Sequence, residues 1–572
     1  MKDKIIGILK SKIFFSFVLN LAIAVICVLV TSFQYDTMED FYNSMYISHF
    51  HYYYNNDINY ILCILIGSLQ FILGRFNCFV LALVGLSFSA FVSITYVFSD
   101  KYGKPKAAVF SVILNILFAL NHYSYVNSSK TSALLLTAGF LLILNAIRNK
   151  RYNLPCWLGI CEILLGSFFN YYYFFVAFAF AFAYFLADMI AKRKYKIAFR
   201  KFFWYSRPFF LMFAFVILLT VGLNQYSISV NTATEESTNF YEYCNLTDSI
   251  KNYPYPNYKD YADEFSAVGL NSEDEYELLK SGYYDENTSL NNDALQVVSD
   301  IQQRTSSKNV FYELGNILSD LCRHIITFDS TVLVLICLII LAAGYIIYQK
   351  RRFCFFPIFI ILTAIISSTV LRYFFESQDY LTYGVRLLMF VMILNSFDFE
   401  QQRPLKHKEI FKFSLPKSIS FGVAVLLLAI GSGLVYAAHF QEIDMSNKPV
   451  SLYIAIKKHP ERYFVIDPGT ETEYLTYTDN YVHPMWGFSS SFMDNVDTFG
   501  AFQKIDSRRK HNLKDNIYEA AVESKYVFII DNSITFRKEN YFTEHYSVNK
   551  EPIVYTQAEE INGYKLYKIY NS

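Results

Sequence analysis

Charged residues are scarce in this chain. Only 17% of its 572 residues are Asp, Glu, Lys or Arg, and 50 basic residues balance 50 acidic ones. A soluble globular protein carries about 25% charged residues. The zero formal net charge leaves no excess of basic residues for a nucleic-acid partner.

Several chemical signatures are also missing. The nine cysteines form no Cys-x-x-Cys pair and no zinc-type spacing. Cys244 and Cys322 fall in a polar region where they could pair, although two free or buried thiols are the other interpretation. The chain has no Walker loop, no Gly-x-Gly-x-x-Gly and no Gly-x-Ser-x-Gly, so nothing indicates an ATPase, a dinucleotide enzyme or a serine hydrolase.

Apolar residues, in contrast, are abundant. Hydrophobic residues make up 53% of the chain and aromatic residues 19%, in long uncharged runs. A membrane span needs about 20 apolar residues. We therefore expect a polytopic membrane protein, not a cytosolic enzyme, a secreted disulfide scaffold or a disordered hub. The candidate spans are 13–33, 58–74, 78–98, 107–126, 131–148, the long stretch 154–190, 208–223, 330–348, 354–371, 382–399 and 419–438.

Basic clusters predict the orientation of these spans, because short inner loops are rich in Lys and Arg. Lysines precede the first span, which reads as an uncleaved signal-anchor with the N-terminus inside. Further inner loops are predicted at 192–201, 350–352 and 403–417. These clusters place the 34–57 loop, the 224–329 loop and the 440–572 tail together outside.

One stretch of the chain does not fit a simple alternation of inner and outer loops. Counting every candidate as a crossing puts Arg148, Lys150 and Arg151 outside, against the positive-inside rule. The alternative makes one segment between 58 and 148 re-entrant and folds 154–190 into a hairpin at Asn170. Both versions predict seven crossings before the large loop and eleven in total.

The tail has the pattern of a small α/β domain. Tyr463–Asp467 and Tyr526–Asp531 are apolar runs of strand length that each end in Asp. Leu513–Ser524 has helical spacing. Asn562-Gly563 is a turn signal between two further strand-like runs, which predicts a closing hairpin and a partly parallel sheet. The basic run 508–511 is interpreted as a solvated face.

The first outer loop carries the strongest chemical signal. If the chain turns helical there, Asp36, Glu39 and Asp40 fall at i, i+3 and i+4 on one face. A carboxylate beside a low-dielectric wall can have a raised pKa and act as a general base on a sugar hydroxyl. The alternative is that these acids only end a helix at the membrane interface.

Other polar residues near the outer side are candidates for substrate contact. His49 and His51 suit a strand face, and the tyrosines around them are typical of an interfacial aromatic belt. Arg372 and Arg386 could clamp a phosphate, or Arg386 could pair with Asp379 or extend toward the headgroups. Asn170 could face a cavity.

The order of these features resembles the GT-C superfamily of membrane glycosyltransferases, which use polyprenyl-phosphate-linked sugars outside the membrane. The shared order is a span, an outer loop opening with paired acids, six further crossings and a large outer loop. The resemblance implies a catalytic carboxylate in the first outer loop, at Asp40 or Glu39.

A closer likeness is to a group of multi-spanning bacterial cell-envelope proteins. It looks similar at Glu39-Asp40, at Tyr253-Pro-Tyr-Pro-Asn-Tyr258, at Val268–Leu279 and in the tail strand that ends at Asp531. The chain departs from that pattern by lacking an Arg before the Tyr-Pro motif and by having Asn170 where an Arg is expected. A non-catalytic copy is therefore the alternative.

The prediction is an all-α polytopic membrane protein of about eleven helices, GT-C-like, with a C-terminal extracytoplasmic α/β domain, in the plasma (inner) membrane. Its parts are a transmembrane module (1–223), a large outer loop (224–329), four more spans (330–439) and the α/β domain (440–572).

The expected function is transfer of a sugar from a polyprenyl-phosphate donor to an envelope glycan or glycolipid. Asp40, then Glu39, would be the base, and Arg386, Arg372, Asp36, His49, His51 and Asn170 would contact substrate. No metal ligand set is evident, although a divalent cation remains open. The alternative is a non-catalytic envelope assembly, transport or scaffold protein, and a glycan polymerase or flippase fits less well.

Overall fold

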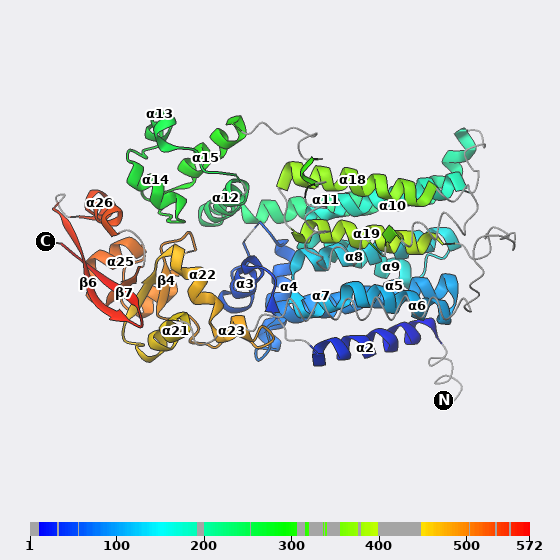
Figure 1. Ribbon diagram of the computed structural model, residues 1–572, viewed down its shortest axis with the longest axis horizontal. Helices are drawn as coiled ribbons and strands as arrows, with labels where there is room; N and C mark the ends of the chain where they lie inside the picture. The colour runs from blue at the N-terminus through cyan, green and yellow to red at the C-terminus, as the bar shows by residue number, and fades with distance from the viewer. Residues whose placement is uncertain are drawn as a thin grey trace.

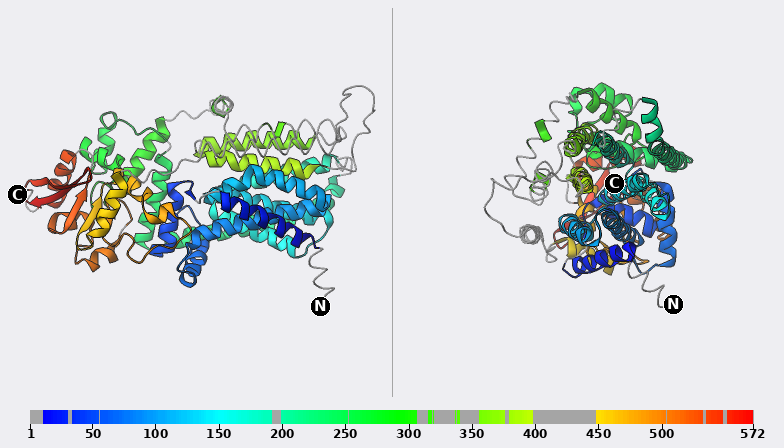
Figure 2. Two further views of the ribbon diagram at one scale, coloured as in Figure 1. Left: turned by 60° about the horizontal axis from the view of Figure 1, so that its bottom comes forward. Right: turned by 90° about the vertical axis from the view of Figure 1, so that its right-hand side faces the viewer.

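The computed structural model contains a bundle of apolar helices and a second lobe that carries the sheet (Figure 1). It describes residues 11–30, 34–54, 56–191, 199–251, 253–305, 355–375, 379–397, 448–502, 504–531, 535–547 and 551–571, with isolated positions between 315 and 339. Figure 2 shows the bundle from its end and the two lobes from another side. The predicted spans 330–348 and 419–438, the inner loops 350–352 and 403–417, and Cys322 lie wholly or largely outside the described residues.

The bundle is built from apolar helices, of which six in the described residues are long and apolar enough to cross a membrane. The candidate membrane spans within these six helices are Lys12–Leu29, Cys78–Tyr102, Ser128–Asn149, Tyr171–Ala191, Ser206–Asn231 and Phe355–Tyr373. The bundle elements are α2 (Lys12–Val30), α4 (Tyr60–Ile72), α5 (Cys78–Tyr102), α6 (Lys104–Leu114), the π-helical turn η2 (Asn115–Ala119), α7 (Leu120–Ser124), α8 (Ser128–Asn149), α9 (Leu154–Phe169), α10 (Tyr171–Ala191), α11 (Phe199–Asn231), α18 (Phe355–Phe375) and α19 (Asp379–Ser396). A polytopic helical membrane protein is the class that this composition and length define.

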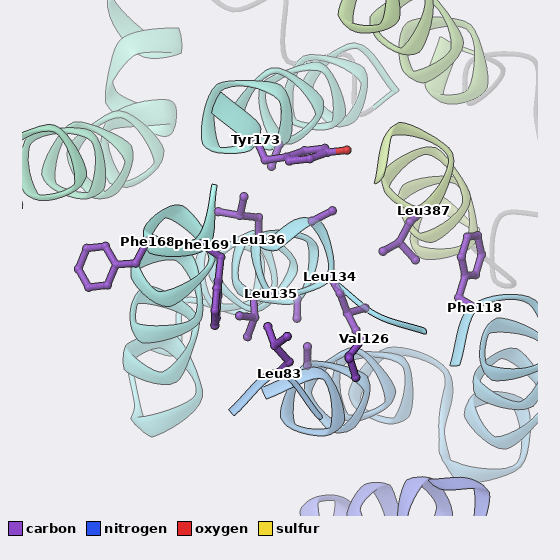
Figure 3. Close-up of a cluster of buried hydrophobic side chains, with 14 of the residues drawn as sticks. Leu83, Phe118, Val126, Leu134, Leu135, Leu136, Phe168, Phe169, Tyr173 and Leu387 are labelled. Atoms are coloured by element: carbon purple, nitrogen blue, oxygen red, sulfur yellow. The ribbon is translucent and has the colours of Figure 1, made fainter. Parts of the chain in front are cut away.

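Helix α8 forms the centre of the bundle. Its side chains Leu134, Leu135 and Leu136 are buried among α5, α9, α10 and α19 (Figure 3). Small residues let α9 approach closely, because a Cβ on Gly139 would lie 2.6 Å from the carbonyl oxygen of Gly159. Such glycine contacts are the usual means of tight helix packing in membranes.

Two ends of the bundle can be distinguished. Lys12 at the start of α2 pairs with Asp100 near the end of α5 at 2.6 Å, and Asn149 at the end of α8 donates to the same carboxylate at 3.0 Å. We call this the Lys12 end, and the opposite end, beside α3 (Met38–Met45), the α3 end. Arg148 lies in the last turn of α8, and Lys150 and Arg151 follow the helix, so all three lie at the Lys12 end.

The path of the chain explains how these basic residues reach the Lys12 end. The backbone N–H of Asn59, just before α4, donates to Phe168 O at the end of α9, and Asn77, just after α4, bonds Ser44 of α3. Both ends of the 13-residue helix α4 therefore lie at the α3 end. Helices α9 and α10 are separated at Asn170, whose Oδ1 accepts from the N–H groups of Tyr172 and Tyr173. Of the two predicted topologies, this arrangement is the one with a re-entrant segment and a hairpin at Asn170. The count of eleven crossings stays a prediction.

The second lobe contains short helices and a five-stranded sheet. Its first part has α3, the π-helical turn η1 (Tyr46–Phe50), α12 (Glu235–Ile250), η4 (Tyr258–Asp260), α13 (Ala262–Ala267), α14 (Glu273–Lys280) and α15 (Asn292–Thr305). Its second part has α21 (Lys448–Lys458), β3 (Tyr463–Ile466), α22 (Pro468–Thr476), α23 (Asp479–Val482), β4 (Val496–Thr498), α24 (Ile505–Lys510), α25 (Ile517–Glu523), β5 (Val527–Ile530), α26 (Thr535–Tyr546), β6 (Ile553–Ile561) and β7 (Tyr564–Asn571). A separate two-stranded parallel pair joins β1 (Gln34–Tyr35) to β2 (Tyr125–Val126).

The strand order is β4-β3-β5-β7-β6, with β3 parallel to β4 and β5, and β7 antiparallel to β5 and β6. The predicted strands, the hairpin turn at Asn562-Gly563 and the mixed sheet are confirmed. The helix predicted from Leu513 starts only at Ile517, because the side chain of Asn516 accepts from the N–H groups of Tyr518 and Glu519 and caps the helix there. Arg508 was wrongly placed on a solvated face, since it is buried and pairs with Asp497 at 3.2 Å.

Candidate functional site

A cavity of about 780 Å³ lies at the α3 end of the bundle. Its walls come from the starts of α4, α8 and α10, the ends of α9 and α11, and Tyr373 near the end of α18. Helix α3, the loop residues 56–57, and helices α12 and α15 of the second lobe supply most of the remaining wall. The cavity is therefore placed where the apolar helices meet the second lobe.

Most of the residues that line this cavity have polar side chains. It contains nine carboxamide side chains: Asn43, Asn56, Asn59, Asn170, Asn224, Asn231, Asn245, Gln302 and Gln303. It also contains six serines and five tyrosines. Amides, hydroxyls and aromatic faces are the groups that bind a polyhydroxylated molecule. Along α11, Asn224, Ser227 and Asn231 have helical spacing and form a polar stripe that faces the cavity.

Three carboxylates, Glu39, Asp57 and Asp248, line the cavity, and among the described lining residues Lys251 is the one side chain of Lys or Arg. Lys251 donates to Asp248 at 2.7 Å and also to Glu39. Burial disfavours the ammonium, but the carboxylates of Asp248 and Glu39 outweigh this and raise the pKa of Lys251 above its usual range. Lys251 is thus held charged between two acids.

Asp57 differs from the other two acids because none of the ion pairs within the described residues includes it. Its carboxylate is exposed to the cavity, while protein surrounds it on the other sides. Burial, then the charges of Asp248 and Glu39, raise the pKa of Asp57 to about 7, and a hydrogen bond from Asn43 at 3.1 Å opposes the rise. A carboxylate with a pKa near neutrality is suited to general-base catalysis.

Asp57 was missed as a site residue by the sequence reasoning. The run around it, Tyr52–Asp57, was interpreted as part of an aromatic belt. The sequence does carry one signal for Asp57. This acid directly precedes an apolar run on the predicted outer side, at the opposite end of the loop that contains Glu39.

Asp40, the predicted base, is not among the lining residues of the cavity. It is buried, accepts from the hydroxyl of Thr37 at 2.7 Å and from the N–H of Ser128 at 3.0 Å. Burial raises the pKa of Asp40 to about 6, and these hydrogen bonds oppose the rise. Asp40 therefore joins α3 to the start of α8, and its neighbour Glu39 faces the cavity.

The three acids of this loop do not share a helix face. Thr37 caps α3 by accepting the N–H of Asp40, so the helix begins after Asp36. Asp36 instead pairs with Lys130 at 3.0 Å and accepts from Asn127. Because the Thr37 cap sets where α3 begins, the side chains of Asp36, Glu39 and Asp40 contact three different partners.

The two histidines also lie outside the cavity lining. The Nε2 of His49 lies 3.0 Å from Phe492 O, and burial lowers the pKa of His49 to about 4. His51 is exposed, has a left-handed backbone (φ 53°) and contacts the ring of Phe71. The predicted strand face is wrong, because these residues lie in and after a π-helical turn.

Of the remaining candidates, Asn170 lines the cavity and donates to Ser129 at 3.1 Å. Arg372 is buried in the last turn of α18, next to the lining residue Tyr373. Arg386 lies on α19 and donates to Thr382 at 3.3 Å. Neither arginine is among the lining residues, and the side chain of Asp379 lies outside the described residues.

A possible metal-ligand group lies elsewhere in the described residues. Oxygen and nitrogen atoms of Glu275, Glu544 and His545 lie within 4.8 Å of one another between α14 and α26. His545 is already 2.8 Å from Glu275, so an imidazole–carboxylate pair accounts for the contact. The cavity acids form no such group in the described part of the chain.

Comparison with known proteins gives no relative. No family model, no curated protein and no solved structure matches this chain.

Proposed function

We propose that this protein is a membrane glycosyltransferase whose reaction takes place in the cavity at the α3 end, on the outer face of a plasma membrane. The observation that carries the proposal is a cavity at the ends of apolar helices, lined mostly by residues with polar side chains, among them the carboxylates of Asp57 and Glu39. A lipid-linked donor can reach such a place from the bilayer, and a glycan acceptor can reach it from outside.

The proposed step is an in-line displacement. The hydroxyl oxygen of the acceptor attacks the anomeric carbon of the donor sugar, and its proton passes to Asp57. The bond between the anomeric carbon and the phosphate oxygen breaks, and polyprenyl phosphate leaves with the electron pair. The configuration at the anomeric carbon is inverted, and Asp57 later releases its proton to water.

The other lining residues have supporting roles in this proposal. Lys251, next to Glu39 and Asp248, is the candidate partner of the donor phosphate. The amides, serines and tyrosines would hold sugar hydroxyls. Glu39 takes a positioning role because it pairs with Lys251, and Asp40 takes a structural one.

The alternative, a non-catalytic glycan-binding protein of the envelope, is favoured by one observation. Three carboxylates against one ammonium make the described lining formally negative, which disfavours a phosphate. Such a protein would bind neutral sugars in the same cavity without needing Asp57 to ionise.

The two functions are distinguished by comparing surface-glycan composition in the native host. The strains are wild type, a deletion, Asp57→Asn and the matched control Asp40→Asn, at equal protein abundance. Transfer predicts that the deletion and Asp57→Asn lose the same sugar and that Asp40→Asn keeps it. A change in the deletion alone would favour the binding protein, and no change in any strain would contradict both.

A further inference from the structure

Exposed apolar side chains form a patch at the end of α4. Helix α4 lies where the bundle meets the second lobe (Figure 1). The exposed fraction is 82% for Phe71, 78% for Ile72 and 58% for Trp486. Leu73 and Phe76 are also exposed, and we call these five residues the Trp486 patch. Its members come from chain segments more than four hundred positions apart.

The two segments are firmly joined. The rings of Phe76 and Trp486 stack with centroids 5.7 Å apart and an interplanar angle of 17°. Two backbone hydrogen bonds, Asn77 N to Met485 O and Gly487 N to Arg75 O, flank the stack at 3.0 Å each. Gly487 is required there, because a Cβ at this position would lie 2.5 Å from Gly74 O. The patch is therefore a built surface, whose aromatic rings are held in place by backbone contacts.

The geometry of α4 indicates what covers this surface. Thirteen residues of α-helix extend about 20 Å, which is less than the ~30 Å hydrocarbon thickness of a bilayer. Helix α4 packs against α5 and α11, two of the helices long enough to cross a membrane. Helix α11 itself exposes apolar side chains such as Leu211 and Leu218. Helix α4 also exposes Ile64, Leu65 and Leu69, so the patch continues an apolar surface along this helix.

The composition of the patch fits the boundary between headgroups and acyl chains. Tryptophan is enriched at this depth because its ring is apolar and its indole N–H is a hydrogen-bond donor. Arg75, exposed beside the patch, can reach lipid phosphates. We propose that the Trp486 patch inserts into the headgroup–acyl boundary of the bilayer, so that the sheet-bearing lobe contacts the membrane through its own residue Trp486. This inference is independent of the glycosyltransferase proposal.

The test is fluorescence quenching in single-tryptophan variants of the full chain. The chain has three tryptophans, at 157, 204 and 486, so Trp157→Phe with Trp204→Phe leaves Trp486 as the only indole. The protein is reconstituted in phosphatidylcholine nanodiscs whose lipids carry bromine near the headgroup or at mid-chain. Iodide in the buffer probes exposure to water. Monodispersity in size-exclusion chromatography verifies that each variant is folded.

Two controls calibrate the measurement. The variant that retains only Trp157, which is exposed on the apolar helix α9, is the lipid-facing reference. A tryptophan-free chain carrying Tyr570→Trp, near the C-terminus at the far end of the sheet, is the water-facing reference (Figure 1).

The proposal predicts that shallow bromine reduces Trp486 emission by about half or more, that mid-chain bromine reduces it less, and that iodide quenches it less than the Tyr570→Trp reference. Quenching by bromolipid no stronger than in the Tyr570→Trp reference would overturn it, whatever the activity of the protein.

Discussion

The side-chain amide of Asn43 donates to the Oδ2 atom of Asp57 across 3.1 Å, which joins the helix at the start of the first loop to the acid at its end. This hydrogen bond favours the charged form of Asp57. Burial and the carboxylates of Asp248 and Glu39 favour the neutral form more strongly, and the pKa rises to about 7. The balance keeps Asp57 in the range where a carboxyl group exchanges protons at physiological pH.

The pH dependence of transfer should therefore respond to Asn43. In wild type we expect the rate to rise with pH to a half-maximum near 7, because Asp57 must lose its proton to act as a base. Asn43→Ala removes the hydrogen bond that favours the carboxylate, so the midpoint should move to higher pH. The measurement is the transfer rate in membranes between pH 5 and 9.

A matched control for this variant is Asn56→Ala, since the side-chain amide of Asn56 donates to Asp248, at 2.8 Å, and not to Asp57. Its midpoint should move less than that of Asn43→Ala. Identical midpoints in wild type and Asn43→Ala would argue against Asp57 as the titrating group.

Asp57→Asn should stabilise the protein above pH 7 while it abolishes transfer. In the unfolded chain the carboxyl group has its ordinary pKa of 3.8, whereas in the folded protein the pKa is about 7. Between pH 3.8 and about 7 the folded protein keeps this proton, whereas the unfolded chain has lost it. The free energy of unfolding therefore falls as the pH rises through this range. The neutral variant avoids this cost, which solvent screening reduces because the Asp57 side chain is exposed, so its Tm at pH 8 should exceed that of wild type by about 2 °C, and at pH 4 the two should be equal. A variant less stable than wild type at pH 8 would contradict the assigned environment.

Asp40 should act on stability and not on chemistry. Asp40→Ala leaves the N–H of Ser128 without its acceptor in a buried place, which costs about 1–3 kcal/mol of unfolding free energy. Asp40→Asn keeps an acceptor oxygen and should retain transfer at nearly the wild-type rate per molecule. Thermal unfolding and specific transfer rates separate the two effects, and an inactive but stable Asp40→Asn would restore Asp40 as the base.

The close contact of α8 and α9 gives a prediction about packing. In Gly139→Ala the new Cβ meets the Gly159 carbonyl oxygen at 2.6 Å, so the helices must separate at a cost of about 1–3 kcal/mol. Gly85→Ala on α5 is the control, because nothing lies within 4 Å of its Cβ position. It should be neutral or stabilising by up to about 1 kcal/mol. Equal melting temperatures for the two variants would contradict this packing.

The sheet depends on a buried ammonium. Lys538 of α26 donates to Asp467 after β3 at 3.1 Å and to Asp531 after β5, and all three side chains are buried. Lys538→Met removes this ammonium from beside the two buried carboxylates and should cost about 3–5 kcal/mol. Lys457→Met, which removes an exposed pair with Asp479, should cost at most about 1 kcal/mol. Limited proteolysis of the sheet-bearing part compares them, and equal resistance would refute a stabilising role for Lys538.

Much of the fold could be predicted from sequence periodicity. Long apolar runs indicated the membrane helices, and the strands ending at Asp467 and Asp531, with the Asn562-Gly563 turn, indicated the sheet. The break at Asn170 was foreseen only as an alternative, because one polar residue in an apolar run does not decide between a kink and a hairpin. Basic residues near 148 favoured the hairpin, and the contacts of Asp100 place that end with Lys12.

The site was only partly predictable for a physical reason. Neighbouring acids are equivalent in a sequence, but the Thr37 cap fixes the helix phase and turns Asp40 inward and Glu39 toward the cavity. Asp57 and Lys251 are almost two hundred positions apart, and the cavity that joins them is formed by tertiary packing. Sequence spacing cannot show that two such distant residues line one cavity.

The central claim, that Asp57 transfers a proton during glycosyl transfer in this cavity, is tested most directly by measuring the donor pool. Polyprenyl-phosphate sugars are extracted from hosts that carry the deletion, wild type, Asp57→Asn or Asp40→Asn at matched abundance, and are quantified by mass spectrometry. We predict that one lipid-linked sugar accumulates in the deletion and in Asp57→Asn but not in Asp40→Asn, while the same sugar is lost from the surface glycan. A wild-type donor pool and glycan in a host with abundant Asp57→Asn protein would contradict the claim.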